Sequence, residues 1–460
     1  MKTRPHGIFG FFLLTAVIAF LTSGCFFPGI PGFSGRSGDT GLKGAYNPPL
    51  VAGGLLITKG SDGVTTPGSE AFTVPSADFT DTGVTAGDAL VIINGGSPGQ
   101  YTIKSISTNA LTVEGLRPEA REPGLSYEVR GRRIYLAGID GYVYALAETA
   151  VSKEAGLSRE GGPSGTGDAM VFGSAQADGF LYAADQSGFP KQQAKIGWRR
   201  PEGNATDLLP LVAAPVLDRG SNTLLVGSET GILYAYNAVT GEELWRKETG
   251  DKIWSTPMVR DGVVYFGSHD KSVYAVLLDS GGDKWEFPTG GVVAAQPLLF
   301  RDQVIVGSFD RRLYSLNMRD GSLRWQVQGN SWFWAGAVTD GSNIFAPSMD
   351  GNVYAIDSGG RVLWKHQVGS SIVSTPVMLP DGLVVAGKDG NITVLDPTTQ
   401  DIGTSRVIYS PSPRDAEIAA PLFANGSSVF VGANDSTVTR VDVASRKSIW
   451  CFHTEDTICD

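Results

Sequence analysis

The segment Gly267-Ser268-His269-Asp270-Lys271-Ser272-Val273-Tyr274-Ala275 joins two short apolar runs through a polar turn, and Trp285 follows ten residues later. The same pattern recurs along most of the chain. Its most regular marker is an aromatic residue at intervals of 40 residues: Tyr234, Tyr274, Tyr314 and Tyr354. Val394 continues this spacing, and weaker copies surround Tyr144, Tyr182 and Val438, which gives eight copies in all.

Each copy contains four short runs rich in apolar, β-branched or aromatic residues. In the fourth copy these runs are Ser255–Val259, Val263–Gly267, Ser272–Leu277 and Lys284–Phe287. Four strands per unit of about 40 residues is typical of a β-propeller blade. No helical periodicity accompanies them. The sequence therefore predicts an all-β fold, an eight-bladed propeller of four-stranded antiparallel blades over residues 47–460.

Composition agrees with this fold and excludes some functions. The chain has 60 Gly in 460 residues, 18% charged residues and 42% hydrophobic residues. Many glycines suit tight turns, and the apolar content is too high for a disordered chain. A net charge of −10 without a basic patch argues against nucleic-acid binding.

A tryptophan recurs in step with the tyrosines and is expected to be structural. The series consists of Trp198, Trp245, Trp285, Trp325, Trp364 and Trp450. Together, the Gly-Ser-x-Asp-Gly-x-Leu-Tyr-Ala core and the Thr-Gly-x-x-x-Trp that follows resemble the PQQ-type (quinoprotein) propeller repeat. In that family the tryptophan wedges between adjacent blades. With an N-terminal Ser23-Gly24-Cys25 that resembles a bacterial lipobox, ahead of eight such repeats, the chain is similar in plan to the propeller lipoproteins of the outer-membrane β-barrel assembly machine.

The resemblance also raises the possibility of an enzyme, because the family includes quinone-dependent dehydrogenases with a Ca²⁺ site and a catalytic Asp. This chain has no adjacent Cys pair and no Cys-x-x-Cys-His motif. Asp270, Asp310, Asp350 and Asp389 recur at one turn offset, as turn geometry requires. We expect no catalytic residue, cofactor or metal; the alternatives are a quinone- or sugar-binding propeller or a relative of the PQQ-dependent dehydrogenases.

The N-terminus has the features of an export signal. Basic residues precede an apolar run from Ile8 to Leu21, and Ser23-Gly24-Cys25 resembles a bacterial lipobox. We predict a signal peptide over residues 1–24, lipidation of Cys25 and a flexible tether over residues 25–46. The protein would then be extracytoplasmic and anchored to a bacterial membrane, the outer one in a diderm host. An ordinary cleaved signal is the alternative.

Two cysteines remain after Cys25, namely Cys451 and Cys459. Two nearby thiols outside the cytoplasm usually pair, so a disulfide is the hypothesis. A zinc site lacks ligands, because His453 is the only other soft donor nearby.

One segment interrupts the repeat. Residues 48–54 and 132–138 would form the first two strands of blade one, and residues 55–131 lie between them. Alternating apolar runs at Ala89–Ile93, Tyr101–Ile106 and Ala110–Val113 predict a small inserted β module. A disordered loop is the alternative.

Aromatic residues gather where two innermost strands begin. Trp254 lies in one such segment, and Trp332, Phe333 and Trp334 occupy the equivalent place 80 residues on. Exposed tryptophans favour partner contacts, whereas buried ones would plug the propeller channel. We take these four residues as the candidate partner surface of a monomeric propeller that binds other envelope proteins.

Overall fold

The computed structural model describes residues 50–82, 84, 86–137, 143–147, 170–173, 180–184, 191–193, 195–200, 213–398, 406–409, 418, 422–425, 427–432, 437–445, 447–453 and 457–458. Every regular element in these ranges is a β-strand, so the all-β prediction is confirmed. No helix with the length and apolarity to cross a membrane occurs within them. The predicted signal peptide, Cys25, the tether and Cys459 lie outside the described residues.

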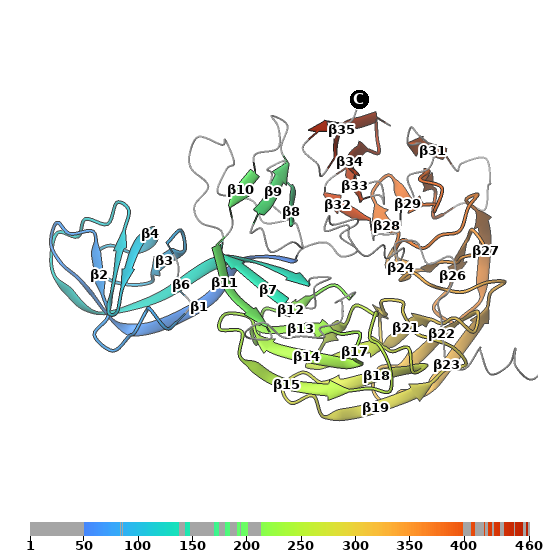
Figure 1. Ribbon diagram of the computed structural model, residues 1–460, viewed down its shortest axis with the longest axis horizontal. Helices are drawn as coiled ribbons and strands as arrows, with labels where there is room; N and C mark the ends of the chain where they lie inside the picture. The colour runs from blue at the N-terminus through green and yellow to red at the C-terminus, as the bar shows by residue number, and fades with distance from the viewer. Residues whose placement is uncertain are drawn as a thin grey trace, which may run out of the picture. The chain divides into compact units, whose positions relative to one another are not determined.

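Five consecutive four-stranded sheets follow one another along the chain (Figure 1). Each is an antiparallel meander in sequence order. The first three are β12 (Val216–Asp218), β13 (Thr223–Gly227), β14 (Ile232–Asn237), β15 (Glu243–Glu248); β16 (Met258–Arg260), β17 (Val263–Gly267), β18 (Ser272–Leu277), β19 (Asp283–Pro288); and β20 (Leu298–Phe300), β21 (Gln303–Gly307), β22 (Arg312–Asn317), β23 (Leu323–Gln328). The next two are β24 (Val338–Thr339), β25 (Ile344–Pro347), β26 (Asn352–Ile356), β27 (Val362–Gln367); and β28 (Val377–Leu379), β29 (Gly382–Ala386), β30 (Ile392–Leu395), β31 (Arg406–Tyr409).

The cores lie between neighbouring sheets. Strands β13, β17, β21 and β29 are buried at every residue, because each has another sheet on both of its faces. One cluster joins Leu225 and Trp245 to Phe266 and Tyr274 of the next sheet. Similar clusters join each later pair of sheets. Face-to-face packing of successive four-stranded sheets is the architecture of a β-propeller.

The N-terminal sheet combines a blade with a closed barrel. Its strands are β1 (Leu50–Thr65), β2 (Ala71–Thr73), β3 (Ala89–Ile92), β4 (Gly99–Ser107), β5 (Ala110–Val113), β6 (Glu122–Ala137), β7 (Val143–Ala147) and β11 (Lys195–Arg200). The order β1-β2-β5-β4-β3-β6, with β6 pairing back onto β1, closes a six-stranded barrel. The outer parts of β1 and β6 pair at Leu50↔Tyr135 and continue into a blade with β7 and β11.

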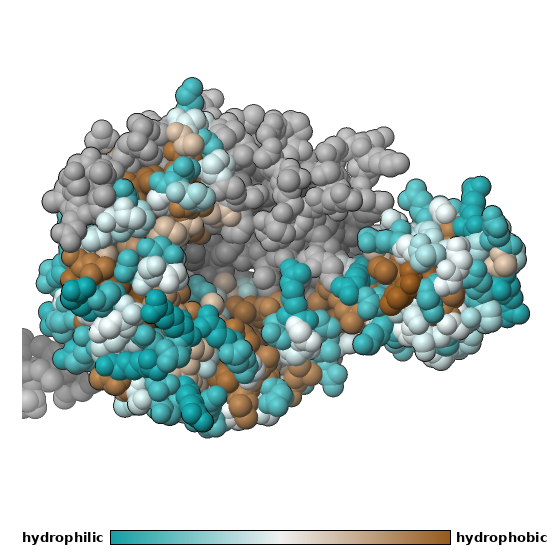
Figure 2. All heavy atoms as spheres, turned by 180° about the vertical axis from the view of Figure 1, so that it is seen from behind, coloured by the Kyte–Doolittle hydropathy of each residue, from teal (hydrophilic) through white to brown (hydrophobic). Residues whose placement is uncertain are grey.

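The barrel has its own core. Phe72 and Phe79 are fully buried and meet the ring of Tyr127 edge-on, with centroids 5.4 and 6.3 Å away. The side of the barrel that is visible in Figure 2 is mostly hydrophilic. Leu55, at the start of the predicted insert, packs instead against Leu224 and Val226 of the blade that contains β12 to β15.

Two further sheets complete the described part of the chain, so that these residues form eight sheets. One consists of β8 (Met170–Gly173), β9 (Phe180–Ala184) and β10 (Lys191–Gln193). The other consists of β32 (Phe423–Asn425), β33 (Ser428–Gly432), β34 (Thr437–Asp442), β35 (Lys447–His453) and β36 (Thr457–Ile458). The number of blades in the whole chain stays a prediction, as do the domain boundaries.

Candidate functional site

The segments that lead from one blade to the next, here called crossing segments, are hydrogen-bonded to the turns between the second and third strands of the blades. Asp270 and Asp310 lie in such turns and accept hydrogen bonds from the backbone N–H of Gly250 and Gly290, each at 2.8 Å. The hydroxyl of Tyr274 also donates to Asp270, at 2.7 Å. The recurrent Asp therefore shapes its own turn and also holds the crossing segment above it.

The same arrangement perturbs the ionisation of the tyrosines. Burial, helped by the hydrogen bond to Asp350, raises the pKa of Tyr354 to about 12. Burial opposes ionisation of Asp350, but the hydrogen bond from Tyr354 outweighs it together with those from Asn352 and Ser348, and its pKa is lowered. The Asp350 carboxylate is thus a charged structural acceptor at neutral pH, which is not the state of a general acid.

Each crossing segment has one buried anchor. Ile253, Val293, Phe333 and Ile372 are fully buried, and each donates its backbone N–H to the carbonyl of a turn serine. Phe333 is the largest of them and packs edge-on against Tyr354, at 5.3 Å between centroids. Because Phe333 is 0% exposed, we leave it out of the candidate partner surface.

The residues on either side of the anchors meet in one cluster. The ring of Trp254 lies 6.2 Å from that of Trp334 and 4.3 Å from that of His269. Phe309 stacks on Trp334 at 5.0 Å and on Trp332 at 4.7 Å, nearly parallel to the latter at 2°. These five residues, Trp254, His269, Phe309, Trp332 and Trp334, are here called the ring cluster, and all are half-buried.

The ring cluster spans three consecutive blades. Trp254 lies between β15 and β16, His269 between β17 and β18, Phe309 between β21 and β22, and both other tryptophans between β23 and β24. The prediction from sequence placed Trp254 two blades from the other pair, and it omitted His269 and Phe309, which fill that gap. Both residues directly follow the Ser of the repeated turn, so an aromatic ring at that position of the repeat is the sequence feature that could have identified them as members of the cluster.

Polar groups border the cluster on one side. The indole N–H of Trp254 donates to Glu229 at 3.1 Å. The Nζ of Lys252 lies 3.8 Å from the same carboxylate and 5.8 Å from the Trp254 ring centroid. Burial lowers the pKa of His269 to about 4, so its ring is neutral at physiological pH. The Nε2 of His269 is buried and has no hydrogen-bond partner among the described residues.

The recurrent tryptophans of the outer strands lie elsewhere, between blades. The indole N–H groups of Trp245, Trp285 and Trp325 donate to backbone carbonyls of Leu278, Met318 and Ser358, at 2.8, 3.0 and 3.0 Å. Each acceptor belongs to the next blade and lies 33 residues further along the chain. The tryptophan therefore fixes the distance between consecutive blades.

A glycine of the next blade makes room for each of these rings. Gly281 and Gly321 adopt φ values of 68° and 72°, and a Cβ there would lie 2.6 and 2.7 Å from the rings of Trp245 and Trp285. Gly360 has the same relation to Trp325. Trp364 is half-buried against Phe345, at 5.8 Å between centroids. Trp198 and Trp450 lie in β11 and β35, and only their backbone is described.

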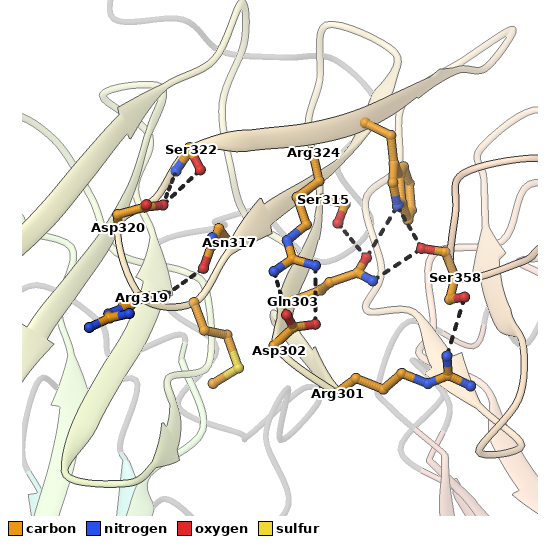
Figure 3. A network of polar contacts seen from close by, with 12 residues as sticks. Arg301, Asp302, Gln303, Ser315, Asn317, Arg319, Asp320, Ser322, Arg324 and Ser358 are labelled. Carbon is orange, nitrogen blue, oxygen red and sulfur yellow. Dashed lines mark hydrogen bonds and ion pairs between the residues drawn. The ribbon is translucent and has the colours of Figure 1, made fainter.

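The junction at Trp325 contains an additional polar network (Figure 3). Gln303 is buried, and its Oε1 accepts hydrogen bonds from Ser315 at 2.6 Å and from the Trp325 indole at 3.1 Å. Its Nε2 donates to the Ser358 carbonyl at 3.1 Å. Nearby, Arg324 forms an ion pair with Asp302. This network lies at the opposite end of the strands from the ring cluster and serves the inter-blade contact.

No group of three or more His, Cys, Asp or Glu residues that could bind a metal ion occurs in the described ranges. The backbone of Cys451 is in β35, and the disulfide with Cys459 stays a prediction.

Comparison with known proteins supports the repeat. The family model described as "Outer membrane protein assembly factor BamB" matches residues 193–331 and 329–403. A quinoprotein ethanol dehydrogenase of Pseudomonas putida is 39% identical over 75 residues, which are 16% of this chain and 11% of that protein. The human β-alanine-activating enzyme is 32% identical over 72 residues, 16% of this chain and 7% of that protein. The chain thus spans only a small part of these curated relatives.

Solved structures with similar folds include BamB from Moraxella catarrhalis, with a TM-score of 0.46 and 18% identity over 62% of this chain and 85% of that one. The computationally designed Ika8 protein has a TM-score of 0.47 and 17% identity over 67% of this chain and 92% of that one. Taken with the sheets and the tryptophan contacts, the family match shows that residues 193–403 consist of PQQ-type propeller repeats similar to those of the outer membrane protein assembly factor BamB.

Proposed function

We propose that the protein is a non-catalytic, protein-binding scaffold of the bacterial envelope, tethered to a membrane through a lipid on Cys25. The observation that carries this proposal is the ring cluster. Five half-buried rings from three blades adjoin on one face of the propeller. Aromatic side chains bury much area with little loss of rotamer freedom, which is why they dominate protein interfaces.

The family match supports the class of partner. The matched family is named for outer membrane protein assembly, so the partners that we propose are other proteins of the envelope, and assembly of outer-membrane proteins is the process. The location that follows from this proposal is the outer membrane, facing the periplasm.

The quinone-dependent enzyme is the competing function, and the local similarity to the ethanol dehydrogenase is its basis. A pyrroloquinoline quinone site needs oxygen ligands for Ca²⁺ beside the quinone. No group of three or more His, Cys, Asp or Glu residues that could bind a metal ion occurs among the described residues, and the recurrent Asp carboxylates already accept hydrogen bonds from the backbone and from tyrosines. These recurrent Asp residues therefore do not fit a Ca²⁺ site beside the quinone.

Site-specific photocrosslinking tests the scaffold directly. A benzoylphenylalanine at position 332 keeps an aromatic ring in the cluster, and the same residue at the exposed position 319 samples the opposite end of β22. Irradiation of cells should give covalent adducts with envelope proteins from position 332 and few from position 319. Equal labelling from both positions, or none from position 332, would refute a binding role for the ring cluster.

A further inference from the structure

The turn between the second and third strands of each blade requires a left-handed residue. Gly231, Gly351 and Gly390 occupy this position with φ values of 79°, 80° and 82°. In the sheets β16–β19 and β20–β23, which contribute His269 and Phe309 to the ring cluster, the residue is Lys271 or Arg311 instead, with φ values of 78° and 69°. The backbone is the same in all five turns, so the two basic residues adopt a conformation that disfavours any side chain.

No side-chain hydrogen bond or ion pair among the described residues compensates for this strain. The side chains of Lys271 and Arg311 are exposed, and neither has an ion pair or side-chain hydrogen bond to another described residue. In contrast, the acidic residues of the same turns, Asp270 and Asp310, are occupied by backbone N–H groups and tyrosine hydroxyls. Lys271 and Arg311 are therefore the charged side chains of these two turns that are exposed, whereas Asp270 and Asp310 are half-buried and hydrogen-bonded.

Both basic residues lie beside the ring cluster. Lys271 follows His269 by two residues and Arg311 follows Phe309 by two residues, within the same turns. Lys252, next to Trp254, adds a third cation, although Glu229 already lies 3.8 Å from it. Asp251 is an exposed residue against the turn of Lys271, where its carbonyl accepts the Ser268 hydroxyl at 2.9 Å, and no acidic residue occupies the equivalent position, Gly291, beside the turn of Arg311.

We propose that Lys271 and Arg311 determine specificity at the ring cluster, and that the segment which binds there is a peptide of a partner protein with carboxylates beside apolar side chains. The apolar side chains would cover the rings, and the carboxylates would pair with the two cations. Placing a long basic side chain at a position suited to glycine destabilises the free protein, and an anionic partner provides the interaction that offsets it. This inference rests on the proposed function.

Replacement by glycine separates this role from a structural one. The double variant Lys271→Gly/Arg311→Gly removes both cations and relieves both strained conformations, so its urea midpoint should rise. Its affinity for an acidic peptide should fall by about threefold to tenfold, the size expected for two exposed ion pairs. Arg301→Gly is the matched control, because Arg301 also has a positive φ (55°) and lies at the other end of β21. It should leave the affinity unchanged.

The probe is a fluorescently labelled octapeptide that alternates Glu and Phe, and its binding to the full-length protein is measured by fluorescence anisotropy. The same peptide with Lys in place of Glu, and vesicles of phosphatidylglycerol, test the charge and the class of ligand. Preference for the Glu peptide, weakened by added salt and by the double variant alone, supports the proposal. Equal binding of the Lys peptide, an unchanged affinity in the double variant, or binding to vesicles only would overturn it.

Crosslinking in the double variant distinguishes the two proposals. If position 332 still labels the same envelope proteins with the same yield, the scaffold stands and the role of the two cations is wrong. If position 332 labels no protein even in the parent chain, the scaffold itself is wrong, whatever the peptides do.

Discussion

Replacing Trp285 by alanine should destabilise the propeller by about 3 to 5 kcal/mol, the range for truncating a large buried aromatic residue. The Trp285 side chain is only 9% exposed, and it belongs to the cluster that joins the sheets β16–β19 and β20–β23. Its indole N–H bond to the Met318 carbonyl, at 3.0 Å, contributes about 1 kcal/mol of this range. The remainder comes from lost apolar contact and the cavity left between the two sheets.

A double-mutant cycle with Gly321 tests whether the ring itself makes this contact. Gly321→Ala alone should cost about 2 kcal/mol or more, because its φ is 72° and the new Cβ would lie 2.7 Å from the Trp285 ring. Once Trp285 is alanine, the clash disappears and only the backbone strain remains. The two losses should therefore sum to more than the loss in the double variant.

Urea unfolding followed by circular dichroism measures these free energies. Trp364→Ala is the control, because Trp364 is only half-buried and makes no indole hydrogen bond among the described residues; it should cost less. Since neighbouring blades stabilise one another, the loss at Trp285 can appear as a broadened transition. Equal urea midpoints for Trp285→Ala and Trp364→Ala, or strictly additive losses in the cycle, would refute the role assigned to this contact.

Four further changes have expected outcomes. Asp310→Asn should lower the free energy of unfolding by about 1 to 3 kcal/mol in urea titrations, because an amide NH₂ would face the N–H of Gly290, which now donates to the carboxylate at 2.8 Å. A loss below a few tenths of a kcal/mol would contradict the role of Asp310 in holding the crossing segment. Between pH 6.5 and pH 4 the free energy of unfolding of the parent should fall by up to about 3 kcal/mol more than that of His269→Phe. The reason is that the folded-state pKa of His269 lies below its unfolded value, so protons bind preferentially to the unfolded chain. Parallel curves of stability against pH for the two proteins would show that His269 is not buried in this way. Removal of residues 59–128, with Thr58 joined to Val129 through Asn-Gly, should leave a folded propeller. Thr58 and Val129 are directly paired across β1 and β6, and Leu55 keeps its contacts with the neighbouring blade. An insoluble product would show that the barrel supports the blades. Cys25→Ala should release the protein into the soluble fraction, because stable anchoring requires lipid chains, and unchanged sedimentation with membranes would contradict lipidation.

Much of the fold was predictable because the same pattern of four strands recurs in successive copies of the repeat. The four predicted runs of the fourth copy coincide with β16 to β19 to within a few residues, and the first strand starts later only because Ser255 to Pro257 belong to the crossing segment. The pairing of Leu50–Ala52 with Arg133–Tyr135 follows the same logic, since the repeat itself shows which strand is missing. Closure of the module into a barrel was not predictable, because alternation fixes strands but not their order.

The candidate site was only partly predictable, for a related reason. Alternation along Trp332-Phe333-Trp334 turns the middle residue inward, and comparison with Ile253, Val293 and Ile372 at the same offset would have identified it as an anchor. His269 and Phe309 reach the cluster from turns of other blades, so their proximity depends on how blades pack. Gln303 could not be anticipated either, because its partners Trp325 and Ser358 come from two different blades (Figure 3).

Residues that differ from the usual residue at their position of the repeat fall into two kinds. Some make contacts within the protein and are structural, whereas others make none with their side chains and are candidates for a function. Gln303 introduces a buried polar group, but three hydrogen bonds satisfy it within the protein, so its presence is explained by stability and register. Lys271 and Arg311 also depart from the repeat, in a conformation that favours glycine, and neither side chain makes a hydrogen bond or ion pair with another described residue that would offset the strain. A local cost without an internal gain is expected where a residue serves something outside the chain. By this criterion we infer partner recognition at the two basic turns next to the ring cluster and a structural role for the inter-blade tryptophans.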